Sequence, residues 1–183
     1  MTVGQSKARV EKFLSRLNGE TPRSRILLAS GLLEELLRAA ILQRLAKNKS
    51  SDKLFGKGCS LGLSTLATYA HALGLIGDKE HDAIKKYADA RNLIAHDWEA
   101  DFSGAQLQEI ASKIQLIGVK GESRMEPHQR CFARLDYLGL FLTEELINRF
   151  ASIPASDFRG GVFLKSMLVD PVTGERVKKV EYS

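Results

Sequence analysis

TPRSRILLASGLLEELLRAAILQRLAK, residues 21–47, is the stretch that decides the fold. Its apolar residues recur at the helical period of about 3.6. They are Ile26, Ala29, Leu33, Leu36, Leu37, Ala40 and Ile41. Further leucines widen this stripe to most of the circumference, which is typical of a helix buried on several sides. With Thr21 as N-cap and Pro22 in the first position, we predict a central helix that ends near Lys47, part of which could also form a dimer contact.

Helical periodicity continues on both sides of this segment. It predicts helices over about 5–18, 60–73, 79–95, 103–117 and 127–150. Residues 47–60 lack such a pattern and are predicted to form a basic loop. The predicted fold class is therefore all-α, a bundle of five to six helices.

The sequence changes in character after Pro154. A short apolar and partly β-branched run, 162–169, is followed by the turn sequence DPVTG and by a weakly alternating run, 177–182. A small C-terminal β-hairpin and a partly ordered tail both fit this pattern. We divide the chain into a helical domain over 1–153 and a tail or hairpin over 154–183.

Composition narrows the class of protein. The 183 residues suit one domain, and 27 Lys+Arg against 22 Asp+Glu give a net charge of +5. Cys59 and Cys131 form no CxxC pair, which argues against a zinc site and a disulfide framework, and we predict no metal and no cofactor. The chain has no apolar run that could span a membrane and no signal-peptide stretch, so we expect a cytoplasmic protein without a membrane partner.

The chemistry-bearing stretch is ARNLIAHDW, residues 90–98. Asn92 and His96 share a helix face, whereas Arg91 lies about 140° around the helix from His96 at about 100° per residue. Arg91 and His96 therefore converge only if the helix frays at His96 or a second subunit contributes. A histidine can move protons near neutral pH, and an arginine can hold a phosphate through two hydrogen bonds. The three side chains form a candidate catalytic set for cleaving RNA without a metal.

The same residues also fit a structural role. Basic side chains favour the C-terminal end of a helix, where His96 could cap free carbonyls and Arg91 could form a surface ion pair.

Two further features are candidates for RNA binding. Four lysines of the predicted loop could attract phosphates: Lys47, Lys49, Lys53 and Lys57. Trp98 could stack on a base. The alternatives are a solvated basic loop and a tryptophan that packs on a neighbouring helix.

Arg91-Asn92 followed by Ala95-His96 at a helix end resembles the signature of the HEPN superfamily. Within it, the chain is most similar to the mannitol operon repressor family over about residues 10–150. The similarity is carried by the apolar helix from Pro22, by Leu61-Gly-Leu-Ser-Thr-Leu-Ala, by Ala72-Leu-Gly-Leu-Ile76 and by Arg130-Cys-Phe132.

The resemblance has two implications that conflict. Many HEPN proteins are dimeric, metal-independent ribonucleases of toxin–antitoxin or phage-defence systems, which would make Arg91, Asn92 and His96 catalytic and RNA, a second copy and an antitoxin the partners. The repressor family is named instead for transcriptional regulation, and this chain shows no recognition helix of a DNA reader. That implies a non-catalytic regulator acting through protein contacts. An antitoxin-like binding module that keeps the motif only as structure is a third reading.

Overall fold

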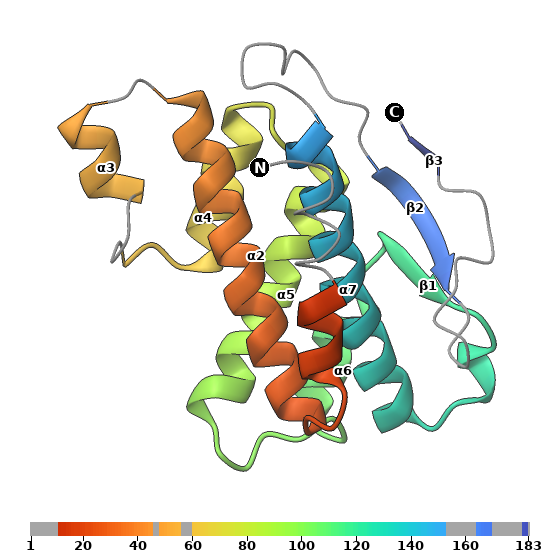
Figure 1. Cartoon of the computed structure of the whole chain (residues 1–183). Helices are drawn as coiled ribbons and strands as arrows, with labels where there is room; N and C mark the ends of the chain where they lie inside the picture. Colours follow the sequence, from red (N-terminus) through yellow and green to blue (C-terminus); the bar gives the residue numbers. More distant parts are fainter. Residues whose placement is uncertain (1–10, 46–47, 56–59, 153–163, 170–180, 183) are drawn as a thin grey trace.

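Helices make up most of the chain, and a small β-sheet lies along one side of them (Figure 1). The computed structural model describes residues 11–45, 48–55, 60–152, 164–169 and 181–182, with backbone alone for 151–152 and for the last two ranges. Residues 11–17 are helical. The other elements are α2 (Pro22–Arg44), α3 (Lys49–Phe55), α4 (Leu63–Ala72), α5 (Asp78–His96), α6 (Ala105–Ser112), β1 (Ile117–Val119), the 3-10 turn η1 (Glu122–Arg124), α7 (Pro127–Ser152), β2 (Leu164–Val169) and β3 (Glu181–Tyr182). The predicted all-α bundle is confirmed.

Helix α2 is the central helix. It packs against α4, α5 and α7, and its predicted apolar positions are all buried. The Thr21 hydroxyl accepts a hydrogen bond from the Ser24 amide at 3.2 Å, so the predicted cap is confirmed. Leu28 stays 43% exposed, so the buried stripe is narrower than the sequence suggested.

Residues 49–55 form helix α3 where the sequence predicted a loop. The side-chain oxygen of Asn48 accepts hydrogen bonds from the amides of Ser50 and Ser51, both at 3.0 Å, which satisfies the free donors of the helix start. At the other end Phe55 is buried and meets the ring of Tyr69 edge to face, with centroids 5.2 Å apart. A cap and one aromatic anchor thus order a helix too short to show a clear period.

The sheet joins distant parts of the chain. Strand β2 pairs in parallel with β1, Ile117 opposite Met167, and antiparallel with β3. The β2–β3 pairing agrees with the predicted hairpin. The predicted helix over 103–117 is too long at its C-terminal end, because α6 covers Ala105–Ser112 and Ile117 begins β1.

Two bidentate ion pairs tie α7 to the other helices. Arg149 donates to the carboxylate of Glu80 at 2.6 and 3.0 Å, and Glu80 is fully buried. Arg25 of α2 donates to Asp136 at 2.6 and 2.8 Å, which raises the pKa of the guanidinium. Both pairs fix how α7 sits in the bundle.

Helix α7 passes very close to α5 at Gly139. A Cβ atom there would fall 2.9 Å from Cζ of Tyr87 and 3.1 Å from Cβ of Ala29. Tyr87 is fully buried, donates its hydroxyl to the carbonyl oxygen of Ile26 at 3.2 Å, and has a raised pKa because of burial. Glycine is therefore the residue that lets the two helices approach over this tyrosine.

Candidate functional site at the C-terminal end of α5

Arg91 and Asn92 lie together in the last two turns of α5. Nη1 of Arg91 donates to Oδ1 of Asn92 at 3.0 Å. Nη2 lies 3.9 Å from Oε1 of Glu34 on α2, a long ion pair. The Arg91 side chain is 33% exposed, and its Nε is buried with no hydrogen-bond partner among the described residues. The guanidinium is thus held on two sides and keeps donor capacity.

His96 is the last residue of α5, and it is exposed. The helix does not fray before it, since the Asp97 amide still donates to the carbonyl oxygen of Leu93 at 3.0 Å. Arg91 and His96 therefore stay about 140° apart around the helix axis. Of the two routes to convergence that the sequence left open, fraying is absent, and the contribution of a second copy of the chain is the one that remains.

The turn after His96 is held by a residue that the sequence analysis missed. Arg23, at the start of α2, donates to the carbonyl oxygens of Asp97 at 3.0 Å and Trp98 at 3.1 Å. A cation beside the last carbonyls of a helix is favourable. The Trp98 side chain remains 82% exposed, so it does not pack on a neighbouring helix.

A shallow cavity of about 210 Å³ adjoins this turn, and its rim is acidic. Asp97, Glu99 and Asp101 line it together with Leu93 and Leu107. The pKa of Asp101 is lowered, first of all by its hydrogen bond from the Ser103 hydroxyl. Three carboxylates beside His96 disfavour a polyanion on this side of the turn.

The lysines lie elsewhere. Lys49 and Lys53 are exposed on α3, which packs near the C-terminal end of α2. The turn at Trp98 contacts the opposite, N-terminal end of α2, and a helix of 23 residues spans about 35 Å at about 1.5 Å per residue. Figure 1 shows α3 and the end of α5 at opposite ends of the bundle. Within one chain these two lysines therefore do not reach His96, and Lys47 and Lys57 lie outside the described residues.

No sequence signal for Arg23 or Glu34 was available, because each acts on α5 from another helix. Residues near in space but 57 to 75 positions apart in the chain cannot be paired by local spacing.

In the part of the chain that the structure describes, no group of three or more His, Cys, Asp or Glu side chains is arranged to hold a metal ion. No helix there is both long enough and apolar enough to pass through a bilayer.

Comparison of the chain with protein-family models, with curated proteins and with solved structures finds no match. The resemblance to HEPN proteins and to the mannitol operon repressor family remains a prediction from residues of the sequence.

Proposed function

We propose that the protein is a metal-independent endoribonuclease that acts as a dimer, with Arg91, Asn92 and His96 in its active site. One observation carries the proposal. Arg91 is fixed against Asn92 at 3.0 Å, while His96 and Trp98 stand exposed at the same helix end.

The chemistry needs two proton-transfer groups and one anion-binding group. The imidazole of His96 from one subunit takes the proton of a ribose 2′-hydroxyl, and the 2′-oxygen attacks the phosphorus. The bond from phosphorus to the 5′-oxygen breaks, and that oxygen takes a proton from the His96 imidazolium of the second subunit. The guanidinium of Arg91 binds the phosphate oxygens as negative charge develops. The products are a 2′,3′-cyclic phosphate and a 5′-hydroxyl.

The test compares purified wild type with His96→Ala on several RNAs in EDTA. We expect cleavage by wild type and a loss of at least about 100-fold in the variant, the range in which acid–base catalysis contributes. His71→Ala is the matched control, because His71 contacts Asp78 at the start of α5. The proposal fails if wild type leaves all the RNAs intact or if His96→Ala cleaves as fast as wild type.

A second candidate is a non-catalytic regulator that acts through protein contacts. It is favoured by the acidic rim beside His96 and by the distance of Lys49 and Lys53 from that end. In this case a partner protein should copurify in fixed stoichiometry with both wild type and Arg91→Ala, and neither protein should cleave RNA. Loss of the partner on Arg91→Ala, or RNA cleavage by wild type, would speak against it.

A further inference from the structure

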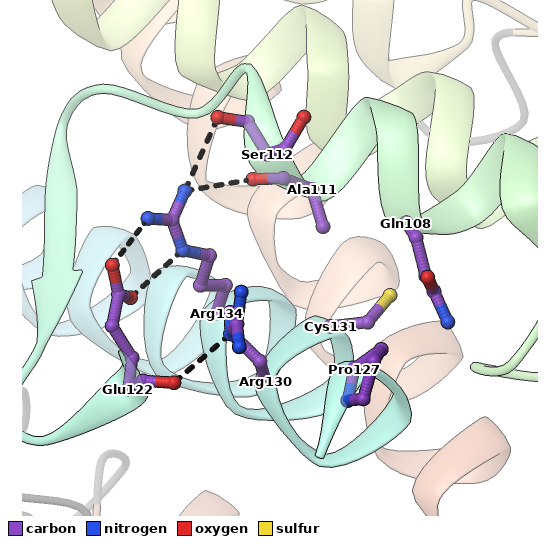
Figure 2. Close-up of a pocket in the computed structure, with 8 residues that line it drawn as sticks. All are labelled: Gln108, Ala111, Ser112, Glu122, Pro127, Arg130, Cys131 and Arg134. Atoms are coloured by element: carbon purple, nitrogen blue, oxygen red, sulfur yellow. Dashed lines mark hydrogen bonds and ion pairs between the residues drawn. The ribbon is translucent and has the colours of Figure 1, made fainter. Parts of the chain in front are cut away.

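A second cavity, of about 240 Å³, lies between α6, η1 and the first turns of α7 (Figure 2). Its polar lining includes Gln108, Ser112, Glu122, Arg130 and Arg134. This volume equals that of about eight water molecules in the liquid, at about 30 Å³ each, so a small molecule would fit in the cavity. None of the residues of the candidate ribonuclease site lines it.

The charge of Arg134 is balanced within the cavity wall. Its Nε and Nη2 donate to the two carboxylate oxygens of Glu122 at 2.9 and 2.6 Å. Its Nη1 donates to the carbonyl oxygens of Ala111 and Ser112, both at 3.2 Å, at the end of α6. The adjacent guanidinium also holds the pKa of the Glu122 carboxyl below its usual range. Arg134 and Glu122 thus form a closed pair that fastens η1 to α6 and α7.

Arg130 differs because main-chain carbonyls alone hold it. Its Nε donates to the carbonyl oxygen of Glu122 at 2.9 Å, and its Nη2 to that of Met125 at 3.1 Å. Among the described residues its Nη1 donates no hydrogen bond. Carbonyl oxygens orient a guanidinium without cancelling its charge, so two arginines and one carboxylate leave this wall with a net charge of +1.

The rest of the lining is uncharged. Burial raises the pKa of the Cys131 thiol to about 11, so this side chain stays neutral at physiological pH. Ala111 and Pro127 add apolar surface. The side-chain nitrogen Nε2 of Gln108 donates to the carbonyl oxygens of Phe102 and Ser103 at 3.2 and 3.0 Å, which fixes the position of this side chain on the opposite wall. The cavity therefore has a net charge of +1, with the oriented guanidinium of Arg130 on one wall and Gln108 across from it (Figure 2).

We propose that this cavity binds a small molecule bearing one oxyanion group, a carboxylate or a phosphate, through Nη1 of Arg130, with a short apolar part against Ala111 and Pro127. A pre-oriented guanidinium loses little conformational entropy on binding, and it donates to either group in the same way. The binding site is independent of RNA cleavage, so each proposal can fail without the other.

The test titrates the folded, full-length protein separately with inorganic phosphate and with butyrate, following amide chemical shifts. We expect saturable shifts at the main-chain amides of Gln108, Arg130 and Cys131 with one of the two anions. The anion that gives them shows whether the cavity binds a phosphate or a carboxylate. Arg130→Gln should weaken that binding at least about tenfold, since a hydrogen bond to a charged group is lost. Arg124→Gln is the matched control, because Arg124 is exposed on η1, outside the cavity lining, and its loss changes the net charge equally.

A second variant covers the case in which Arg130→Gln disturbs the fold. Ser112 is exposed at the rim, so Ser112→Asp adds a negative charge without removing the hydrogen bonds of Arg130. It should also weaken binding at least about tenfold, through repulsion of the anion. The proposal is overturned if neither anion gives saturable shifts with wild type, or if a folded Arg130→Gln or Ser112→Asp protein binds as tightly as wild type.

Discussion

Two histidines stack where α4 meets α5. The rings of His71 and His81 lie 4.7 Å apart with 9° between their planes. Nε2 of His71 contacts Oδ1 of Asp78 at 2.8 Å, and Nε2 of His81 lies 3.4 Å from the hydroxyl of Thr68. Each ring thus has a polar neighbour, and the two imidazoles share one small volume in which two positive charges would repel.

The environment of His81 makes stability depend on pH. Burial lowers its pKa most, and the positive charges of His71 and Lys85 lower it further against the opposing effect of Asp82 and Asp78. The unfolded chain then binds the proton more readily than the folded one, so the free energy of unfolding rises with pH. This loss of folded-state stability is absent above the pKa of an ordinary histidine, about 6.5. It grows as the pH falls from that value through the lowered pKa of His81 in the folded protein.

We expect His81→Gln to reduce this pH dependence. Urea unfolding of wild type and variant at several values between pH 7.5 and 5 provides the measurement. Wild type should lose more stability than the variant over that range. If the free energy of unfolding changed equally with pH in the two proteins, the effect assigned to His81 would be contradicted.

At the scale of elements, the packing of α7 on α5 depends on Gly139. Gly139→Ala places a methyl group against Tyr87, and overpacking of this kind costs about 1–3 kcal/mol. Alanine gains about 1 kcal/mol over glycine in a helix, so we expect a net decrease in the free energy of unfolding. Gly31→Ala is the matched control, because nothing lies within 4 Å of the added Cβ on α2. That variant should gain about 0.5–1 kcal/mol in denaturant unfolding, and an equal gain at both positions would refute the close approach.

Breaking the buried ion pair between α7 and α5 should lower the free energy of unfolding more than Gly139→Ala does. Arg149→Met leaves the fully buried Glu80 carboxylate without its bidentate partner. Removing one member of a buried pair costs about 3–5 kcal/mol. Thermal and urea unfolding should show this loss, and Glu80→Gln combined with Arg149→Met should recover part of it. A single variant as stable as wild type would show that the pair contributes nothing.

The elements that the sequence predicted well are those with many apolar repeats. α2, α5 and α7 are long enough for the 3.6-residue period to be counted, and their predicted starts lie within a residue or two of those observed. α3 has only seven residues and was missed, since its order comes from Asn48 and from packing of Phe55. β1 has three residues, and its partner lies beyond α7, so local pattern carried no sign of it.

For the whole molecule, the candidate site raises the question of how many chains complete it. Local spacing placed Arg91, Asn92 and His96 at one helix end, and the structure agrees. It could not show that Arg23 and Glu34 attach that end to α2, because those contacts depend on tertiary packing. The intact helix up to His96 then leaves a second copy as the remaining route to the proposed chemistry.

Mixing wild type with an inactive variant tests this consequence of the proposed function. If one cleft needs His96 of both subunits, a heterodimer of wild type and His96→Ala is inactive. Unfolding and refolding wild type with an equal amount of His96→Ala should leave about half of the RNA cleavage that the same wild-type protein gives alone, since only about a quarter of the dimers then hold two intact subunits. Activity equal to that of the wild-type protein alone would place the whole site in one chain.

The parallel pairing of β1 with β2 also has a consequence for the order of events in folding. Helices form from contacts between near neighbours in the sequence, whereas the whole of α7 lies between Ile117 and its partner Met167 in the chain. Closing so long a loop costs conformational entropy before the backbone hydrogen bonds between the strands can offset that cost. The helices should therefore assemble first and present β1 as an open edge, on which the C-terminal strands close as the last step.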